Sequence, residues 1–142
     1  MHGVTFPRGT DGWSRHQANT LLHMLDEIAR RDDFPALIDL FTEDCIFRLG
    51  ALPEQKGRVA LRQVLSGLVM RRKGERLNRS CVAIDGNRLT IRWDGTWTDR
   101  DSGAQMAGFG IEVWTMRAGK IIQLEGTYNI AEETVARPAL AA

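Results

Sequence analysis

The chain has 142 residues, a formal net charge of +1, 43% hydrophobic residues and 26% charged residues. This length suits one domain with a substantial core and is too short for two. The composition is typical of a soluble globular protein, and the near-neutral charge argues against a global attraction to nucleic acid or to an anionic membrane.

Three helices are expected in the first half of the chain. Ser14 is a suitable N-cap for a helix that extends to about Arg31. The apolar stripe of this helix consists of Leu21, Leu22, Leu25, Ile28 and Ala29. A short helix is predicted over residues 35–41 and a third over residues 58–70, with a strand over residues 45–49 between them.

Strands follow one another after the third helix. Alternating apolar residues predict four of them, over residues 77–84, 88–98, 104–116 and 120–130. The basic segment 71–76 is expected to be a solvated loop that does not bind nucleic acid. Short turns rich in Gly, Asn and Asp separate the strands, which makes sequential strands antiparallel neighbours.

Helices first and long strands afterwards indicate an α+β fold, in which helices cover one face of a curved antiparallel or mixed sheet. We expect a single domain over residues 15–132, an irregular arm over residues 1–14 and a loose tail over residues 133–142. The two cysteines, Cys45 and Cys81, have no metal-binding or redox spacing. This favours a reduced intracellular chain, although a pair that meets in space stays open.

Targeting signals are missing from the sequence as it stands. The first residues lack the apolar core of a signal peptide, and no run approaches the length of a membrane span. We therefore expect a cytoplasmic protein that does not associate with membranes.

The segment IRWDGTW raises the question of which face of the sheet is the inside. A period of two places Ile91, Trp93 and Trp97 on one side of this strand. Arg92 and Asp94 fall on the other side, which faces either solvent or a cavity.

A second strand offers a hollow surface. In the strand 104–116, Gly108 and Gly110 share one face with Glu112 and Trp114. Two glycines at alternate positions leave a depression that suits a ligand or the close packing of another element. The sequence alone does not say how the faces of the two strands combine.

Three segments resemble the limonene epoxide hydrolases of the nuclear transport factor 2-like, or SnoaL-like, superfamily. They are FTEDCIFRLGALPEQKGRVALRQVLSGL (41–68), RLTIRWDGTW (88–97) and GKIIQLEGTYN (119–129). The resemblance covers most of the chain from about Thr20 to Glu132. It implies a nuclear transport factor 2-like domain, in which a cone-shaped sheet surrounds a pocket closed by the N-terminal helices.

In the epoxide hydrolases that the chain resembles, an Arg-x-Asp pair faces the interior of the cone, and the Asp is the general acid. Arg92 and Asp94 match this pair, and the resemblance therefore places both in the cavity as catalytic residues. The half of the site that activates water is missing. The family's Tyr, Asn and basic Asp correspond here to Phe47, Leu49 and Gly126, so standard epoxide hydrolysis is not expected.

The ketosteroid isomerases of the same superfamily provide a second comparison. Their hydrogen-bonding carboxylic acid lies on the strand that Glu112 matches, whereas their base would fall at Leu49. The expected catalytic set is therefore Arg92, Asp94 and Glu112. Two carboxylates beside one Arg in an apolar cone could divide into an acid and a base.

The function expected from this set is a cofactor-free enzyme that acts on an apolar oxygenated molecule by isomerisation, dehydration or cyclisation through epoxide opening. Two alternatives stay open: an epoxide hydrolase with a rearranged water site, and a non-catalytic ligand-binding or assembly protein of the same fold. Neither a metal nor a cofactor is expected, since the histidines have no third ligand at metal spacing.

A substrate would contact the apolar lining of the cone. The lining is expected to contain Leu25, Phe47, Leu49, Gly108, Gly110, Trp114, Leu124, Gly126 and Tyr128. The resemblance also places Trp93 and Trp97 on the convex face of the sheet, where large exposed aromatic residues suggest an interface. The family commonly forms homodimers through this face, and we expect a homodimer here.

Overall fold

The computed structural model describes residues 5–133. The predicted tail therefore lies outside the described residues from residue 134 onward, as do residues 1–4 of the predicted N-terminal arm. Residues 5–14 form no helix or strand, as expected for the arm.

Three helices form at the predicted places. They are α1 (Arg15–Arg30), α2 (Phe34–Asp39) and α3 (Arg58–Arg71). The Ser14 hydroxyl accepts a hydrogen bond from the Gln17 backbone N–H, and the Gln17 side chain accepts one from the Ser14 N–H. This reciprocal capping box satisfies two N–H groups that the first turn of α1 would otherwise leave unpaired.

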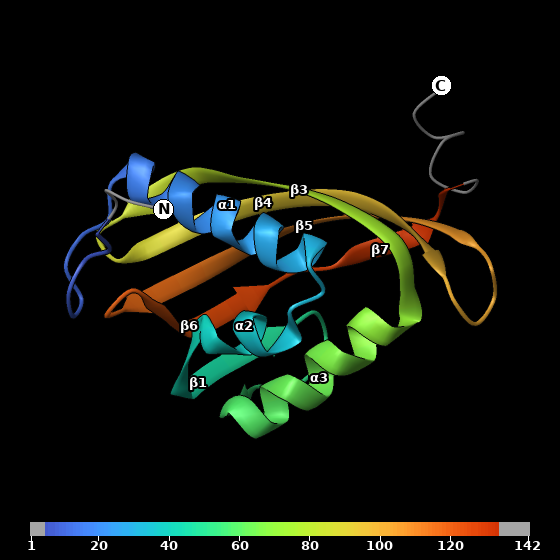
Figure 1. Cartoon of the computed structure of the whole chain (residues 1–142), viewed down its shortest axis with the longest axis horizontal. Coiled ribbons are helices and arrows are strands. Elements are labelled where there is room, and N and C mark those ends of the chain that lie inside the picture. The colour runs from blue at the N-terminus through green and yellow to red at the C-terminus, as the bar shows by residue number, and fades with distance from the viewer. Residues whose placement is uncertain (1–4, 134–142) are drawn as a thin grey trace.

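Seven strands form one curved mixed sheet (Figure 1). They are β1 (Phe41–Leu49), β2 (Gln55–Lys56), β3 (Arg72–Asp85), β4 (Arg88–Asp99), β5 (Gln105–Arg117), β6 (Lys120–Gly126) and β7 (Asn129–Glu132). The strand order is β2-β1-β6-β5-β4-β3, and β7 pairs with β5. Among the strands of residues 5–133, only the pairing of β1 with β6 is parallel, and the expectation of a curved antiparallel or mixed sheet is confirmed.

Several boundaries differ from the prediction, since α2 ends at Asp39, β1 already begins at Phe41 and the short β2 forms between β1 and α3. The basic segment 71–76 is not a loop, because α3 runs directly into β3 at Arg72. This start of β3 pairs with the end of β4, and that tertiary pairing outweighs the polar composition of the segment.

The strand predicted over residues 120–130 is also divided. β6 ends at Gly126, and β7 begins at Asn129 and pairs with β5 at positions 106–109. The Thr127 N–H donates to the Ile111 carbonyl oxygen at the break, so the chain bends there without leaving this amide unpaired.

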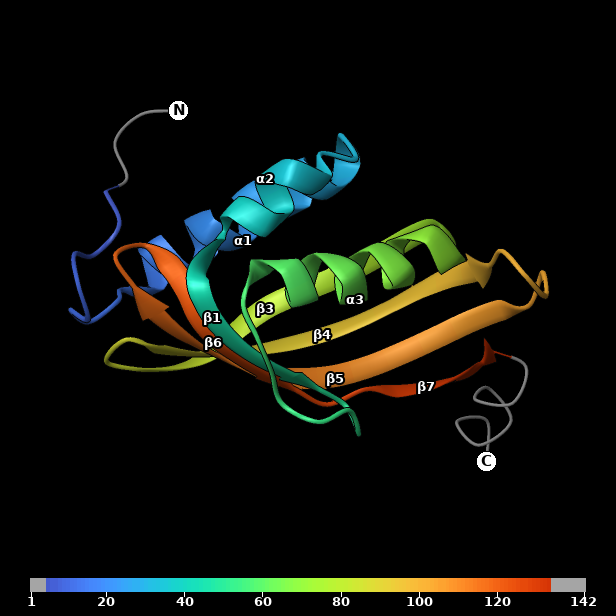
Figure 2. The same ribbon diagram turned by 90° about the horizontal axis from the view of Figure 1, so that it is seen from below.

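All three helices lie over the concave face of the sheet (Figure 2). The core forms between the helices and this face. Its largest fully buried side chains are Phe47, Leu21, Leu61, Leu89, Ile91, Met116, Ile121 and Cys45. The predicted α+β cone is therefore confirmed.

Two further observations concern the cysteines and the helices. Cys45 in β1 and Cys81 in β3 are free and buried, so they do not form the pair that the sequence left open. Within residues 5–133, no helix combines the length and the apolar character needed to cross a bilayer.

Candidate functional site

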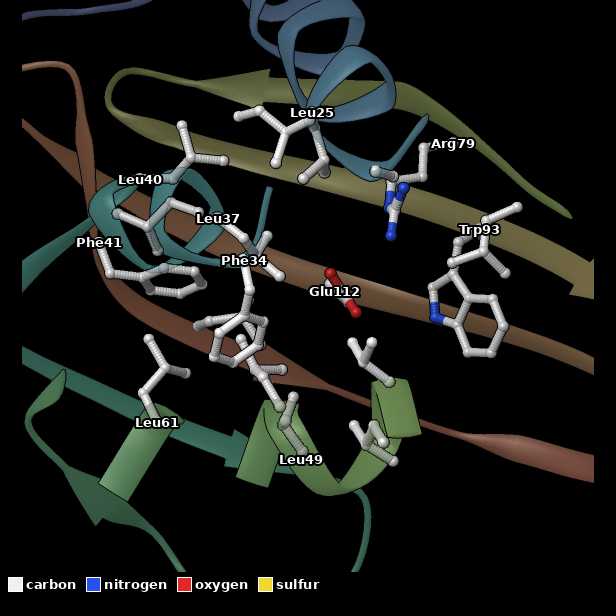
Figure 3. A pocket seen from close by; sticks show the side chains of 18 of the residues that line it. Leu25, Phe34, Leu37, Leu40, Phe41, Leu49, Leu61, Arg79, Trp93 and Glu112 are labelled. Carbon is white, nitrogen blue, oxygen red and sulfur yellow. The ribbon is translucent and has the colours of Figure 1, made fainter. Parts of the chain in front are cut away.

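A cavity of about 220 Å³ lies between the concave face of the sheet and the three helices. Leucine, isoleucine and phenylalanine side chains from α1, α2, α3, β1 and β6 form most of its wall (Figure 3). Charged and polar lining residues gather on β3, β4 and β5, as well as in the loop before α2. An apolar cavity with a few convergent polar groups is the usual form of a small-molecule site.

Glu112 is the acidic residue that β5 contributes to the cavity wall. It lies directly opposite Ile91 of β4 and Gly126 of β6, and its carboxyl group points into the cavity (Figure 3). Trp114, two residues along the same strand face, donates its indole N–H to Glu112 Oε1 at 2.8 Å. One carboxyl oxygen is therefore held in place and the other is free to contact a ligand.

Burial raises the pKa of Glu112 above its ordinary value of 4.5. The hydrogen bond from Trp114 and the positive charge of Arg79 act in the opposite direction but have smaller effects. The cavity therefore favours the neutral carboxylic acid, which can donate a hydrogen bond or a proton.

Gly126 makes room for this carboxylic acid. A Cβ atom at position 126 would lie 2.9 Å from Glu112 Cγ, closer than real side-chain carbons approach. The glycine is therefore needed beside Glu112, although it does not itself belong to the cavity wall.

Trp93 of β4 also lines the cavity, and it is only 3% exposed. Its indole ring lies over Gly110, where an added Cβ atom would be 2.3 Å from Trp93 Nε1. The indole N–H has no hydrogen-bond partner among residues 5–133. A buried N–H group without an acceptor costs about 1–3 kcal/mol, so an acceptor on a ligand would stabilise the site.

Tyr128 follows β6 and contacts Trp93 edge to face, with the ring centroids 5.6 Å apart. Burial raises the pKa of Tyr128, and the nearby Glu112 adds to this effect. The phenol is therefore neutral at physiological pH and is a hydrogen-bond donor rather than a base.

The β3 side of the cavity carries two arginines, of which one is hydrogen-bonded and the other makes no hydrogen bond within residues 5–133. Arg72 donates to Glu75 at 2.7 Å and stacks on Trp97, with 4.0 Å from its Cζ atom to the ring centroid. The Arg79 guanidinium has only a 3.7 Å ion pair with Asp26, which is too long for a hydrogen bond. Figure 3 shows the Arg79 side chain directed into the cavity near Glu112.

The predicted placement of Arg92 and Asp94 in the cavity is wrong. Both side chains project from the convex face, where Arg92 lies over the Phe109 ring and Asp94 accepts a hydrogen bond from Asn78 at 3.2 Å. Glu112 pairs with Ile91, so it shares a face with the apolar residues of β4 and not with Arg92. The structure therefore does not bring the predicted Arg-Asp-Glu set together.

The predicted exposure of Trp93 and Trp97 is wrong for the same reason. Trp97 is 5% exposed and stacks with Arg72, while Trp93 lines the cavity. Neither side chain is available as a convex dimer contact. The homodimer itself stays a prediction, and Phe109 and Ile111 are exposed apolar residues on this face.

The structure places six of the nine residues of the predicted lining in the cavity wall. Leu25, Phe47, Leu49, Trp114, Leu124 and Tyr128 line the cavity. Gly108, Gly110 and Gly126 do not. The hollow that Gly108 and Gly110 leave is filled by tryptophan rings, since an added Cβ atom at Gly108 would lie 2.9 Å from both Trp93 and Trp97.

The sequence did not identify six polar or charged residues of the cavity wall, Asp32, Asp33, Arg72, Glu75, Arg79 and Trp93, and the last two matter most for the site. The sequence gives no face for Arg79 in its strand, and the resemblance places Trp93 on the outer face. The hairpin between β4 and β5 indicates that Trp93 and Gly110 share a face. The two residues are cross-strand partners, and the pairing places the largest side chain opposite the smallest.

Comparisons with known proteins agree with this architecture. The family model of the SnoaL-like domain matches residues 11–124. A provisionally assigned polyketide cyclase from Xanthomonas campestris pv. campestris superposes with a TM-score of 0.68 at 24% identity, covering 81% of this chain and 92% of that chain. No curated protein sequence matches the chain.

Two structures of named enzymes are also similar. The epoxide hydrolase/cyclase-like enzyme SalBIII, which has a role in pyran ring formation in the polyether salinomycin, has a TM-score of 0.67 at 16% identity, covering 82% of this chain and 95% of that chain. An LEH-like epoxide hydrolase from M. tuberculosis has a TM-score of 0.64 at 11% identity, covering 81% of this chain and 84% of that chain. At these identities the likeness establishes the fold and not the reaction.

Proposed function

We propose, since the chain belongs to the SnoaL-like domain family, that it is a cofactor-free enzyme that rearranges a small, largely apolar, oxygenated molecule. The observation that carries this proposal is the Glu112 carboxyl group in an apolar cavity, with one oxygen held by Trp114 and its pKa raised by burial. A carboxylic acid kept neutral in this way suits general-acid catalysis on an oxygen atom of the substrate.

The reaction that fits best is ring closure by epoxide opening within one molecule. Glu112 donates its proton to the epoxide oxygen while the adjacent C–O bond breaks. A hydroxyl oxygen of the same molecule forms the new C–O bond, and its proton returns to the Glu112 carboxylate. Substrate and product are isomers, so the step needs no co-reactant.

The wall beside Glu112 supports rearrangement over hydrolysis. Phe47 and Leu49 are buried and line the cavity, and neither side chain has an atom that could hold or deprotonate a water molecule. In ring closure the nucleophile belongs to the substrate, so the apolar wall is no obstacle. The cyclase-like enzyme SalBIII is a precedent for ring formation in this fold.

A panel of terpenoid and polyketide-like hydroxy-epoxides, incubated with the protein in ¹⁸O-labelled water, tests the proposal. We expect a cyclic ether of unchanged mass, because no water oxygen enters the product. Incorporation of the label would instead identify an epoxide hydrolase with a rearranged water site. Binding of panel members without conversion would support the non-catalytic alternative.

A further inference from the structure

We propose that Arg79 and Trp93 form a subsite for a carboxylate group of the ligand, next to Glu112. The inference narrows the substrate class of the proposed function and rests on that function only for the catalytic role of Glu112. It predicts a ligand with an apolar body and one anionic end, in place of a wholly neutral oxygenated molecule.

Arg79 and Trp93 are direct cross-strand partners. Arg79 of β3 pairs with Trp93 of β4, so both side chains leave the same, concave face of the sheet. Directly opposite residues have Cβ atoms about 4.5–5.5 Å apart, a separation that one small group can bridge. Figure 3 shows the Arg79 guanidinium and the Trp93 indole nitrogen on the Glu112 side of their side chains.

Both partners have unused hydrogen-bonding capacity. The Trp93 indole N–H is buried and has no acceptor within residues 5–133. The Arg79 side chain is four-fifths buried, at 19% exposure, yet its guanidinium makes no hydrogen bond to any residue in that range. A buried arginine without hydrogen bonds is uncommon in a protein, because its five N–H groups all require acceptors.

Two other arginines of this region, Arg72 and Arg15, are hydrogen-bonded. Arg72 is bound by Glu75 and by the Trp97 ring, and Arg15 donates to the Cys81 carbonyl oxygen at 2.7 Å. Arg79 has only the loose pair with Asp26, whose side chain is 45% exposed and therefore in contact with solvent. An anionic ligand could therefore engage Arg79 without breaking a hydrogen bond.

The chemistry of the two donors selects a carboxylate. The guanidinium and the indole N–H can only donate, so the ligand must provide acceptors, and the positive charge favours an anion. A carboxylate has two oxygens, one for each donor. Its negative charge would also favour the neutral form of Glu112, so that the three groups are compatible in one cavity.

The test compares two ligands of equal size, 2-naphthoate and 2-naphthamide, which differ in charge and not in shape. Titration calorimetry measures both affinities, and the fluorescence of the cavity tryptophans reports whether the ligand enters. The unaltered protein is expected to bind 2-naphthoate at least about tenfold more tightly than 2-naphthamide. Equal affinities, or no binding of 2-naphthoate, would overturn the proposal.

Variants of Arg79 and Trp93 test whether these residues cause the preference for 2-naphthoate over 2-naphthamide. Arg79→Met, which keeps the length and bulk of the side chain, is expected to abolish the preference, and Arg79→Lys to restore part of it. Trp93→Phe keeps an aromatic ring and is expected to weaken 2-naphthoate binding by about threefold to tenfold. Arg92→Gln removes the same charge from the convex face and is expected to leave both affinities unchanged.

Retention of the full preference in Arg79→Met, or an equal loss in Arg92→Gln, would contradict the subsite. These measurements need no turnover, so they separate this inference from the proposed function. An active Glu112→Gln variant would refute the acid chemistry and leave the carboxylate preference intact.

Discussion

Replacement of Glu112 with glutamine is expected to lower substrate turnover by about 10²–10⁴-fold, the usual contribution of a positioned general acid. Glutamine has the shape of the neutral acid, and its side-chain oxygen can still accept the hydrogen bond from Trp114. It cannot transfer a proton. The expected loss therefore falls on kcat, with little change in ligand binding or in the free energy of unfolding.

Asp94→Asn is the matched control for this experiment. Asp94 lies on the neighbouring strand, but its carboxylate is on the convex face, bonded to Asn78. We expect unchanged turnover in this variant. Full activity of Glu112→Gln, or a comparable loss in Asp94→Asn, would show that the acid is not Glu112.

Replacement of Gly110 with alanine is expected to lower the free energy of unfolding by about 3 kcal/mol, at the upper end of the usual cost of overpacking. The added Cβ atom would lie 2.1 Å from the Thr127 carbonyl oxygen and 2.3 Å from Trp93 Nε1. The carbonyl belongs to the backbone and the indole is rigid, so neither can move without disturbing the cavity. Thermal unfolding measures the loss, which corresponds to a fall in Tm of roughly 10 °C.

Gly67→Ala provides a control that is expected to raise the free energy of unfolding, whereas Gly110→Ala is expected to lower it. Gly67 lies inside α3, and an added Cβ atom there meets nothing within 4 Å. Alanine should stabilise the helix by about 0.5–1 kcal/mol, because glycine loses more backbone entropy on folding. A Gly110→Ala protein as stable as the unaltered chain would show that Trp93 does not occupy the position described above.

The burial of Ile91 and Trp93 was predictable from the sequence, and the error came from the resemblance. Alternation alone places Ile91, Trp93 and Trp97 on one apolar face, and this face is the buried one. The match of Arg92 and Asp94 to a family motif suggested the opposite. A displacement of one residue in a strand alignment exchanges the two faces, so a short motif at low identity is weaker evidence than the hydrophobic pattern.

The helices were more predictable than the ends of the strands. Local signals such as the Ser14–Gln17 capping box and the apolar stripe of α1 identify a helix without knowledge of its neighbours. The start of β3 and the separation of β7 from β6 depend on pairing with β4 and β5. Long-range partners of this kind leave little trace in the segment itself.

Only some of the polar residues of the site could be predicted from the sequence. Glu112 could be identified, because the resemblance to the ketosteroid isomerases places their carboxylic acid on the strand that Glu112 matches. The role of Arg79 depends on the cross-strand register that places it beside Trp93, and on the absence of a close acceptor among residues 5–133. Neither property follows from residue types or spacing.

The protonation state of Glu112 determines whether the proposed chemistry is feasible, and infrared spectroscopy measures it directly. The spectrum of the unaltered protein minus that of Glu112→Gln isolates the carboxyl band of this one residue. Because burial raises the pKa of Glu112, we expect the band of the neutral acid to persist to a pH well above 4.5, where ordinary carboxyl groups are already ionised. Loss of the band near pH 4.5, the ordinary value, would show that Glu112 is a carboxylate at neutral pH and would contradict its role as the acid.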